Sequence, residues 1–441
     1  MSGRDTTLGR LESDEVSFVQ LQFADILGAS KGVTIPAARL AEALDEGVWF
    51  DGSAVEGLAR VAEHDLYLRP DIATYAIVPW ESSRTARFIA DLHFPNGEPF
   101  LADPRRALKA VLAETATLGF DYQVACELEF WVFEARNATD ALVPVDAGGY
   151  FEVTAERAER LCRSAIRALS SLGVEVAMSH HEVAPGQHEI DMSPMHALAL
   201  ADALVATKTA LRAYGRESGL FVSFMPKPIA DAAGSGLHVQ QFLIDRRDGQ
   251  DAFSAYDDPY GLSANGRRFI AGQLAHARGL SAVIAPLVNS YKRLMGGAEA
   301  PGHISWARTN RGSYIRVPHA GPRGRMQIEL RAPDPSCNPY LALAAMLRTG
   351  IEGIQNELPL PAPVEQPARR PATRGASDEE PVALLPRTLD EALEGLEWDP
   401  VVRGALGQEI YERFLAAKEH EWAEHSAHIS QWELLAYLER A

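Results

Sequence analysis

Polar and apolar side chains alternate in several short segments of the chain, which is the pattern of a strand buried on one face only. The sharpest example spans positions 327 to 331. There Gln327, Glu329 and Arg331 fall on one face, and Ile328 and Leu330 fall on the other. Prolines follow and end the strand, because proline cannot donate a hydrogen bond to a ladder. This segment therefore predicts a strand with a core face and a face that carries a carboxylate beside a guanidinium.

Acidic strands of the same kind recur earlier in the chain. Glu127 and Glu129 stand at alternate positions among apolar neighbours, and residues 180–190 hold two acidic pieces around a Pro-Gly turn. Behind a glycine-rich stretch, His238 and Gln240 share one face of a further strand. The polar faces of these strands are the candidates for a common site.

Helical periodicity separates the strands. Asp103 is a candidate N-cap with Pro104 at the first helical position, and Gly119 is the expected end of that helix. Further helices are expected near residues 154–172, 194–217, 265–277 and 339–356. Interleaved strands and helices indicate an α+β domain, with a curved antiparallel sheet and helices outside it.

The first part of the chain has a different pattern of short strands, glycine turns and one short helix from Pro36 to Leu44. A proline-rich stretch near the end predicts an exposed loop, and the capping box that begins at Thr388 predicts helices after it. We therefore expect these segments: a first domain at 13–97, a second at 103–441, and within the second a loop at 358–387 and helices at 388–441.

Composition narrows the class of protein. The 441 residues suffice for two or three domains, and 46% hydrophobic with 23% charged residues is ordinary for a soluble globular protein. The net charge of −18 argues against nucleic-acid and anionic-membrane partners. No apolar run reaches about 18 residues and no signal peptide opens the chain. Three widely separated cysteines favour a reducing, cytoplasmic location.

The polar faces point to metal chemistry. Five glutamates and a histidine on strand faces would repel one another strongly without cations between them. Oxygen-rich sites with one imidazole suit Mg²⁺ or Mn²⁺ better than Zn²⁺. A solvated edge strand with an ordinary Glu/Arg pair is the alternative for 327–331 taken alone. Neither a P-loop nor a Rossmann glycine pattern is present, so a nucleotide would be held in another way.

The order of these motifs resembles the glutamine synthetase superfamily, and the resemblance runs from about Phe23 to Glu352. Its motifs are E-L-E at 127–129, H-H-E-V-A-P-G-Q-H-E at 180–189, G-S-G-L-H at 234–238, N-S-Y-K-R at 289–293 and I-E-L-R-A-P-D-P-S-C-N-P-Y at 328–340. The resemblance implies a small N-terminal β-grasp domain and a large catalytic domain. It also implies a carbon–nitrogen ligase that joins glutamate to ammonia or a small amine with ATP as co-substrate.

The resemblance also implies a role for individual residues. Two or three Mg²⁺ or Mn²⁺ ions per site are expected, one held by Glu129, Glu182 and Glu189 and a second by Glu127, His238 and Glu329. Glutamate would be bound by Gly234, Arg293, Arg331 and Tyr150, and ATP by Arg311, Arg316 and Gln240. A surface salt bridge is the alternative for Arg316, and a buried structural tyrosine is the alternative for Tyr150. His181 and His188 are expected to be structural.

The amine end carries Asp51, which matches an aspartate that binds and deprotonates ammonium, and Glu299, which matches a glutamate on a lid loop. Arg311 completes the expected catalytic set. The chain departs from the family pattern at Ala54, Ala233, Gln240 and Gln327. The loss of a hydroxyl at Ala54 favours a less polar acceptor, such as a small organic amine.

The resemblance implies a homo-oligomer, a dodecamer of stacked hexameric rings with active sites shared between neighbours. Three functions stay open at this point. They are a γ-glutamyl–amine ligase for a small organic amine, an ordinary ammonia-assimilating glutamine synthetase, and a catalytically silent protein of this fold with a binding or regulatory role.

Overall fold

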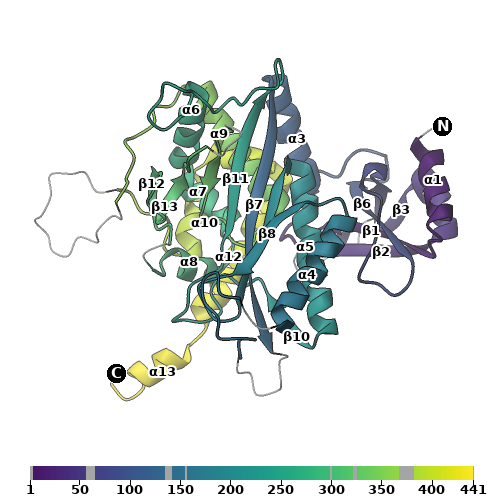
Figure 1. Ribbon diagram of the computed structural model, residues 1–441, viewed down its shortest axis with the longest axis horizontal. Coiled ribbons are helices and arrows are strands. Elements are labelled where there is room, and N and C mark those ends of the chain that lie inside the picture. The colour runs from purple at the N-terminus through teal and green to yellow at the C-terminus, as the bar shows by residue number, and fades with distance from the viewer. Residues whose placement is uncertain are drawn as a thin grey trace, which may run out of the picture.

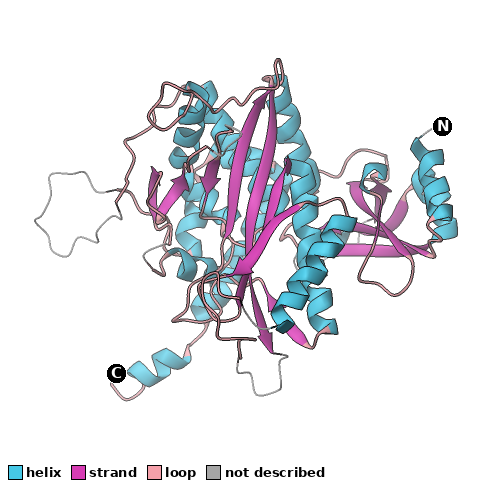
Figure 2. Ribbon diagram, viewed as in Figure 1, coloured by secondary structure: helices cyan, strands magenta, loops and turns pink. Residues whose placement is uncertain are grey.

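The computed structural model describes residues 3–55, 65–134, 142–153, 156–297, 300–320, 325–366 and 382–440. It contains two separate sheets, a smaller one near the N-terminus and a larger one at the centre of the molecule (Figure 1). Most helices surround the larger sheet (Figure 2).

The smaller sheet has six strands, in the order β2-β1-β6-β4-β3, with β5 also paired to β6. Its strands are β1 (Phe18–Ala24), β2 (Ser30–Pro36), β3 (Val48–Asp51), β4 (Asp65–Pro70), β5 (Ala76–Ile77) and β6 (Thr85–His93). The central pair, β1 and β6, is parallel, and the other pairs are antiparallel. This arrangement confirms the mixed α/β character expected of a small N-terminal β-grasp domain.

The larger sheet has eight strands, in the order β12-β13-β14-β11-β7-β9-β8, with β10 paired to β7. Its strands are β7 (Phe120–Glu134), β8 (Val176–His181), β9 (Gln187–His196), β10 (Leu220–Ser223), β11 (Leu237–Asp245), β12 (His303–Ala307), β13 (Ser313–Arg316) and β14 (Ile328–Leu330). The expectation of an antiparallel sheet holds for every pair except β12 and β13, which run parallel. Residues 308–312 bring the chain back toward the start of β12, so β13 runs in the same direction as β12.

The helices lie before, between and after these strands. They are α1 (Gly3–Ser13), α2 (Leu40–Glu46), α3 (Pro104–Thr117), α4 (Glu156–Ser171), α5 (Ala197–Glu217), α6 (Ala264–Ala275), α7 (Ala277–Ile284), α8 (Val288–Leu294), α9 (Pro339–Gln355), α10 (Leu389–Glu397), α11 (Pro400–Leu406), α12 (Gln408–Ala427) and α13 (Gln431–Tyr437), with short 3₁₀ turns η1 (Ala37–Arg39), η2 (Gly52–Val55) and η3 (Ile72–Thr74). Among the described helices, none combines the length and apolarity needed to cross a bilayer.

The helix expectations agree with the structure to within a few residues. Asp103 caps α3 by accepting a hydrogen bond from the backbone N–H of Arg105, as the sequence predicts. The helix expected near 265–277 is divided at His276 into α6 and α7. Helix α1 was not predicted, because its sequence is mostly polar and lacks an apolar stripe.

A buried arginine connects the N-terminal part of the chain to helices α3 and α5. Arg105 on α3 forms ion pairs with Asp71 at 2.9 Å, with Asp91 at 2.8 Å and with Asp202 at 3.0 Å. The first two carboxylates belong to the N-terminal part, and Asp202 lies on α5. Because a buried charge that loses its partner is costly, this network fixes the N-terminal part against α3 and α5.

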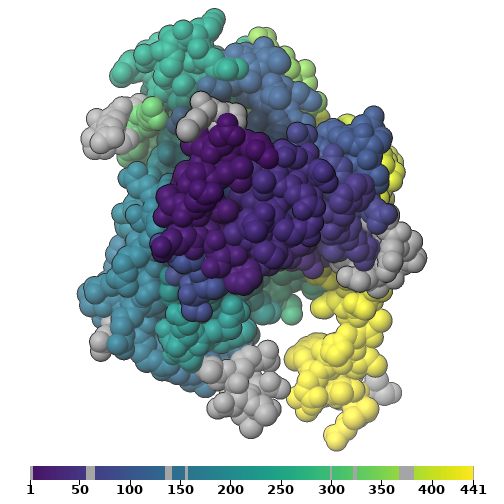
Figure 3. All heavy atoms as spheres, turned by 90° about the vertical axis from the view of Figure 1, so that its right-hand side faces the viewer, coloured from purple at the N-terminus to yellow at the C-terminus, as the bar shows by residue number. Residues whose placement is uncertain are grey.

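A second contact between the two parts lies next to the β14 segment. Asn338 caps α9 through its side-chain oxygen, and its side-chain N–H groups donate to the carbonyls of Asp25 and Ile26. Gly28 approaches so closely that a Cβ atom there would lie 2.8 Å from the Cα of Asn338. The turn after β1 is thus held directly against the segment that follows β14. Figure 3 shows the N-terminal part, in purple, lying over the rest of the molecule.

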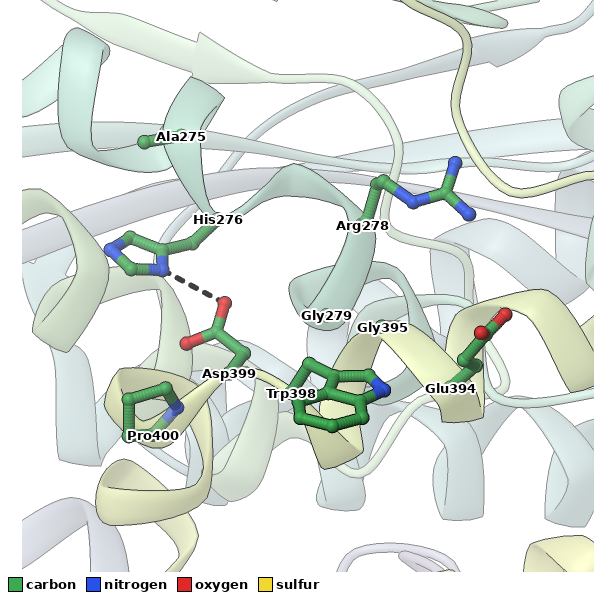
Figure 4. A pocket seen from close by; sticks show the side chains of 9 residues that line it. All are labelled: Ala275, His276, Arg278, Gly279, Glu394, Gly395, Trp398, Asp399 and Pro400. Atoms are coloured by element: carbon green, nitrogen blue, oxygen red, sulfur yellow. Dashed lines mark hydrogen bonds and ion pairs between the residues drawn. The ribbon is translucent and has the colours of Figure 1, made fainter.

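The C-terminal helices are connected to the core by His276. Its protonated ring donates hydrogen bonds on both sides, from Nδ1 to Asp399 at 2.8 Å and from Nε2 to Glu352 at 3.2 Å. Asp399 also caps α11, and Glu352 lies on α9. Figure 4 shows this contact at one side of a pocket whose opposite rim carries Arg278. Three helical elements therefore depend on one imidazole.

Burial lowers the pKa of His276, but the hydrogen bonds and charges of Asp399 and Glu352 outweigh it, so the pKa lies above its ordinary value. A raised pKa in the folded state contributes stability that is present below the unfolded pKa of about 6.5 and is lost as the pH rises through the folded pKa. We expect His276→Gln to lower the unfolding free energy by about 1–3 kcal/mol near pH 6. The difference from wild type should shrink toward pH 9.

Urea unfolding of both proteins at a series of pH values measures this difference. His428→Gln, at an exposed position of the C-terminal segment, is the matched control and should leave the unfolding curve unchanged. A His276→Gln deficit that stays constant or grows with pH would contradict a charged His276.

Candidate functional site

The polar faces of the central strands line a cavity of about 390 Å³. Its walls contain Glu127, Glu129, Tyr150, Phe151, Met178, His180, Glu182, Val183, Glu189, Asp191, Ala233, Gly234, His238, Arg293, Gly296, Gly297, Ala300, Pro301, Arg311, Arg316 and Arg331. These residues come from β7, β8, β9, β11 and β13, from helix α8, and from the loops beside them, including the segments before β11 and after β14. Acidic residues and arginines that are far apart in the sequence therefore face one space.

The first cluster in this cavity contains Glu127, His238 and Glu329, whose ligand atoms lie within 4.8 Å of one another. His238 Nδ1 lies 2.8 Å from Glu127 Oε2 and 3.8 Å from Glu329 Oε1. Strand register explains the meeting, because β11 pairs His238 with Glu127 and pairs its next alternate residue, Gln240, with Glu329. The structure thus brings together three residues that the sequence predicts to share a metal ion.

The second cluster contains His180, Glu182 and Glu189, again with ligand atoms within 4.8 Å. His180 Nε2 lies 3.1 Å from Glu189 Oε1, and its Nδ1 lies 3.8 Å from Glu182 Oε1. The sequence predicts Glu129 here and not His180. Alternation could have identified His180, since it stands two positions before Glu182 and therefore faces the same side.

Glu129 lies between the two clusters. In strand register it faces Glu189, its Oε1 lies 3.7 Å from His238 Nε2, and its Oε2 accepts a hydrogen bond from Gln187 at 2.9 Å. This position places its carboxylate within reach of both groups of ligands.

Asp191 is a further acidic residue that the sequence reasoning missed. Its side chain lines the cavity, it is only 7% exposed, and its Oδ1 has no hydrogen-bond partner among the described residues. Burial raises its pKa to about 6. Its spacing of two from Glu189 was the available signal, since i and i+2 share a strand face.

Electrostatics show that these carboxylates are short of positive charge. Burial raises the pKa of Glu127, and burial followed by repulsion from neighbouring glutamates raises the pKa of Glu129 and Glu189. Burial also lowers the pKa of His238, helped by nearby arginines, so its ring is neutral. Clustered oxygen ligands, one imidazole per cluster and an orphaned carboxylate oxygen fit Mg²⁺ or Mn²⁺.

Two arginines neutralise part of this charge. Glu329 is 2% exposed, and its two oxygens accept hydrogen bonds from Arg331 at 2.5 Å and from Arg316 at 3.0 Å. The alternation read from 327–331 is confirmed, because Ile328 and Leu330 are fully buried on the opposite face. Arg331 also donates to the carbonyl of Arg311.

Arg293 has a different environment. Its guanidinium donates to the carbonyls of Arg331, Ala332 and Pro333, at 2.7–3.0 Å. A Cβ atom at Gly236 would lie 2.4 Å from its Nη2, and one at Gly234 would lie 2.7 Å from its Cγ. Arg293 therefore braces the segment after β14, and the glycines before β11 leave room for it.

The remaining predicted residues are distributed as follows. Tyr150 lines the cavity, is 46% exposed, and lies with its ring centroid 6.0 Å from the Arg311 guanidinium. Gln240 does not line the cavity but donates to Glu127 Oε1 at 2.6 Å. Asp51 ends β3 in the N-terminal sheet and does not line the cavity. Glu299 lies outside the described residues.

Behind the second cluster lies a buried group of Asp146, His181 and His188. His181 Nε2 lies 2.9 Å from Asp146 Oδ1, and its Nδ1 lies 2.6 Å from the carbonyl of Glu182. Asp146 also accepts from the backbone N–H of Gly186. This group connects the loop before Tyr150 to the β8–β9 turn, consistent with the structural role expected of both histidines.

Comparisons with known proteins cover the whole chain. The family described as "Glutamine synthetase, catalytic domain" matches residues 101–437, and "Glutamine synthetase, beta-Grasp domain" matches residues 15–95. The chain is 42% identical to the glutamine synthetase of Thermus thermophilus over 439 residues, with 98% of each protein covered. It is 40% identical to that of Methanosarcina mazei over 439 residues, with 99% of this chain and 97% of the relative covered.

Among solved structures, one described as a GmaS/ADP complex superposes with a TM-score of 0.86 at 29% identity, covering 98% of this chain and 99% of the other. GmaS without ligand gives 0.85 at the same identity and coverage.

Because these carboxylates lack positive charge, a bound metal ion should reverse the order of stability of wild type and Glu189→Gln. Without metal ions, Glu189→Gln removes a repelling charge, so we expect a melting temperature above that of wild type. With Mn²⁺ at about 100 times its Kd, binding stabilises wild type by about 2.7 kcal/mol. Glu189→Gln binds the ion more weakly, so the order should reverse.

Thermal unfolding with and without Mn²⁺ measures both orders. Glu134→Gln, on the same strand but outside the cavity, is the matched control and should shift neither curve appreciably. If Glu189→Gln were less stable than wild type in both buffers by the same amount, the carboxylate would be structural and not a metal ligand.

Proposed function

We propose, from the premise that this chain belongs to the glutamine synthetase family of carbon–nitrogen ligases, that it is an ATP-dependent γ-glutamyl–amine ligase. Its substrates would be glutamate, ATP and a small amine, and its products a γ-glutamyl amide, ADP and phosphate. The observation that carries the proposal is the convergence of two carboxylate–histidine clusters with Arg311, Arg316 and Arg331 on one cavity.

The chemistry requires activation of glutamate, because a carboxylate is a poor electrophile. An oxygen of the γ-carboxylate attacks the terminal phosphorus of ATP, the bond from that phosphorus to the bridging oxygen breaks, and ADP leaves. The amine nitrogen then attacks the carbonyl carbon of the γ-glutamyl phosphate. Phosphate leaves with the carboxylate oxygen, and a base takes the proton from the new amide nitrogen.

The two clusters would hold divalent ions. Glu127, His238 and Glu329 would hold one ion and Glu182 and Glu189 another, with Glu129 and His180 beside them. When bound, Mg²⁺ or Mn²⁺ would neutralise charge on the phosphate oxygens, which is the main catalytic need in phosphoryl transfer.

The arginines would act on the same charge. Arg316 is about one third exposed at its side chain, so its guanidinium can reach a phosphate while one N–H remains on Glu329. Arg331 is held more tightly by Glu329 and by the Arg311 carbonyl, which suits a fixed contact to glutamate. Arg293 would support glutamate binding through the segment it braces, together with Gly234.

Two of the predicted residues, Gln240 and Asp51, do not line the cavity, and their proposed roles follow from where they lie. Gln240 donates to Glu127, so its contribution to ATP binding would be indirect. Asp51 lies on the N-terminal sheet outside the cavity, so we propose that a second copy supplies it, in a homo-oligomer with shared active sites. Glu299 would close over the intermediate from the loop after Gly297, and Tyr150 would line the amine path.

Two amines are candidates for the acceptor of the γ-glutamyl group. Ala54 in place of a hydroxyl residue favours a small organic amine, and the likeness to GmaS hints at a γ-glutamylamide synthetase. The second candidate is ammonia, which the relatives named glutamine synthetase at about 40% identity favour. Both candidates share the activated intermediate, and they differ only at the second step.

Phosphate release from the purified protein with ATP, Mg²⁺ and glutamate tests the proposal. Separate reactions contain ammonium, methylamine, ethanolamine or putrescine. We expect release that depends on glutamate and is highest with methylamine or ethanolamine. Arg316→Gln should lower kcat about 10²–10³-fold, the size seen when one transition-state donor is removed.

Glu329→Ala should abolish release, and Glu134→Ala on the same sheet should not change it. Release with ammonium alone would establish the second candidate and refute the inference from Ala54. Tight binding of ATP or glutamate without release under any amine would establish the catalytically silent alternative.

A further inference from the structure

Helix α5 carries three cations on one face, outside the site described above. Lys208, Arg212 and Arg216 are spaced four residues apart, so they lie one above another along the helix. They line a cavity of about 560 Å³ together with Leu27, Gly28, Ala29, Leu220, Phe221, Val222, Ser223, Phe224, Met225, Leu287, Pro335 and Ser336. None of these residues lines the carboxylate cavity.

The charge of this lining is unusual for the protein. It contains three cations and no carboxylate, although the chain has 60 acidic and 42 basic residues and a net charge of −18. Among the described residues, none of the three forms an ion pair. Lys208 Nζ donates to the Cys337 carbonyl at 3.5 Å, and the Arg212 guanidinium lies 4.9 Å from the Phe224 ring centroid.

Ordinary structural roles do not account for all three cations. A cation in the last turn of a helix interacts favourably with the helix dipole, which explains Arg216. Lys208 and Arg212 lie more than one turn before the end at Glu217, where that effect has faded. Lys208 is also partly buried, and burial lowers its pKa. The buried carboxylate of Asp334 attracts this amine but forms no ion pair with it, so the amine lacks a direct anionic partner unless an anion completes the site.

We propose that this cavity binds a small organic anion with two separated anionic groups, either carboxylates or phosphates. Residues four apart rise about 6 Å along a helix, so two such groups could meet two successive cations. The side chains of Phe221, Phe224 and Met225 supply an apolar wall for the part between them. Ser223, whose Oγ accepts a hydrogen bond from the backbone N–H of Met225, supplies a hydroxyl donor.

The place of the cavity gives such an anion an effect on the fold. Gly28 and Ala29 belong to the N-terminal turn that Asn338 holds, and Pro335 and Ser336 follow the β14 segment that carries Arg331. An anion bound here touches both parts of the molecule at once. Its binding therefore stabilises their contact, independently of the amine that the enzyme uses.

Titration calorimetry tests the proposal on the full-length protein in buffer freed of metal ions by resin, with 1,3-propanediol bisphosphate and glutarate as probes. One anion should bind per chain, and whichever probe binds more tightly identifies the phosphate or the carboxylate class. Arg212→Gln and Lys208→Met should each weaken binding about tenfold or more, the cost of one charge-assisted hydrogen bond. The melting temperature should rise with the bound anion in wild type.

Three variants separate this cavity from other anion sites. Arg316→Gln and Arg331→Gln alter the carboxylate cavity and should leave probe binding unchanged, which also keeps this result independent of the proposed ligase activity. Arg247→Gln removes an exposed surface cation and is the charge-matched control.

Two results would overturn the proposal. The first is binding that follows Arg316 or Arg331 and ignores Arg212. The second is that neither probe binds at about 10 mM. If Arg212→Gln also lowers the oligomeric mass in that case, the three cations contact carboxylates of another copy of the chain and not a small anion.

Discussion

Repulsion among buried carboxylates is the constraint on which the site depends. Glu127, Glu129, Glu189 and Asp191 lie on adjacent strands of one sheet face, and burial raises the pKa of each. A fold driven only by stability would not gather them. Arg316 and Arg331 neutralise Glu329, whereas among the described residues these four acids form no ion pair with an arginine or a lysine. The site is therefore unfavourable until cations enter it, which is expected of a site that holds divalent metal ions.

The rest of the fold holds this arrangement in place. Arg105 and Asn338 join the N-terminal part to α3, α5 and the start of α9. Arg293 braces the segment after β14, and Asp146 with His181 braces the turn between β8 and β9. Each brace is a polar or charged side chain that hydrogen-bonds to a neighbouring segment. Strain from crowded acids is thus opposed by rigid neighbours, and the cavity keeps its shape before ligands bind.

The sequence was most informative where strand alternation places residues on a face. Alternation placed Glu127, His238 and Glu329 on polar strand faces, and the family resemblance grouped them. They meet because β7, β11 and β14 are adjacent. His180 and Asp191 obey the same alternation but were missed, because motif resemblance directed attention to other positions. Arg293 donates to backbone carbonyls and Gln240 donates to Glu127. Both contacts depend on tertiary packing, which no local sequence pattern contains. The parallel β12–β13 pair depends on tertiary packing in the same way, whereas helix α1 was missed because its polar sequence carries no apolar stripe.

Transfer of oxygen from glutamate to phosphate tests the central claim most directly. Glutamate labelled with ¹⁸O in its γ-carboxylate is incubated with ATP, Mg²⁺ and the best acceptor amine, and the released phosphate is analysed by mass spectrometry. If the cavity activates glutamate as an acyl phosphate, each phosphate carries one labelled oxygen. Unlabelled phosphate, released at the same rate, would mean that water attacks ATP in this cavity, and the ligase account would be wrong.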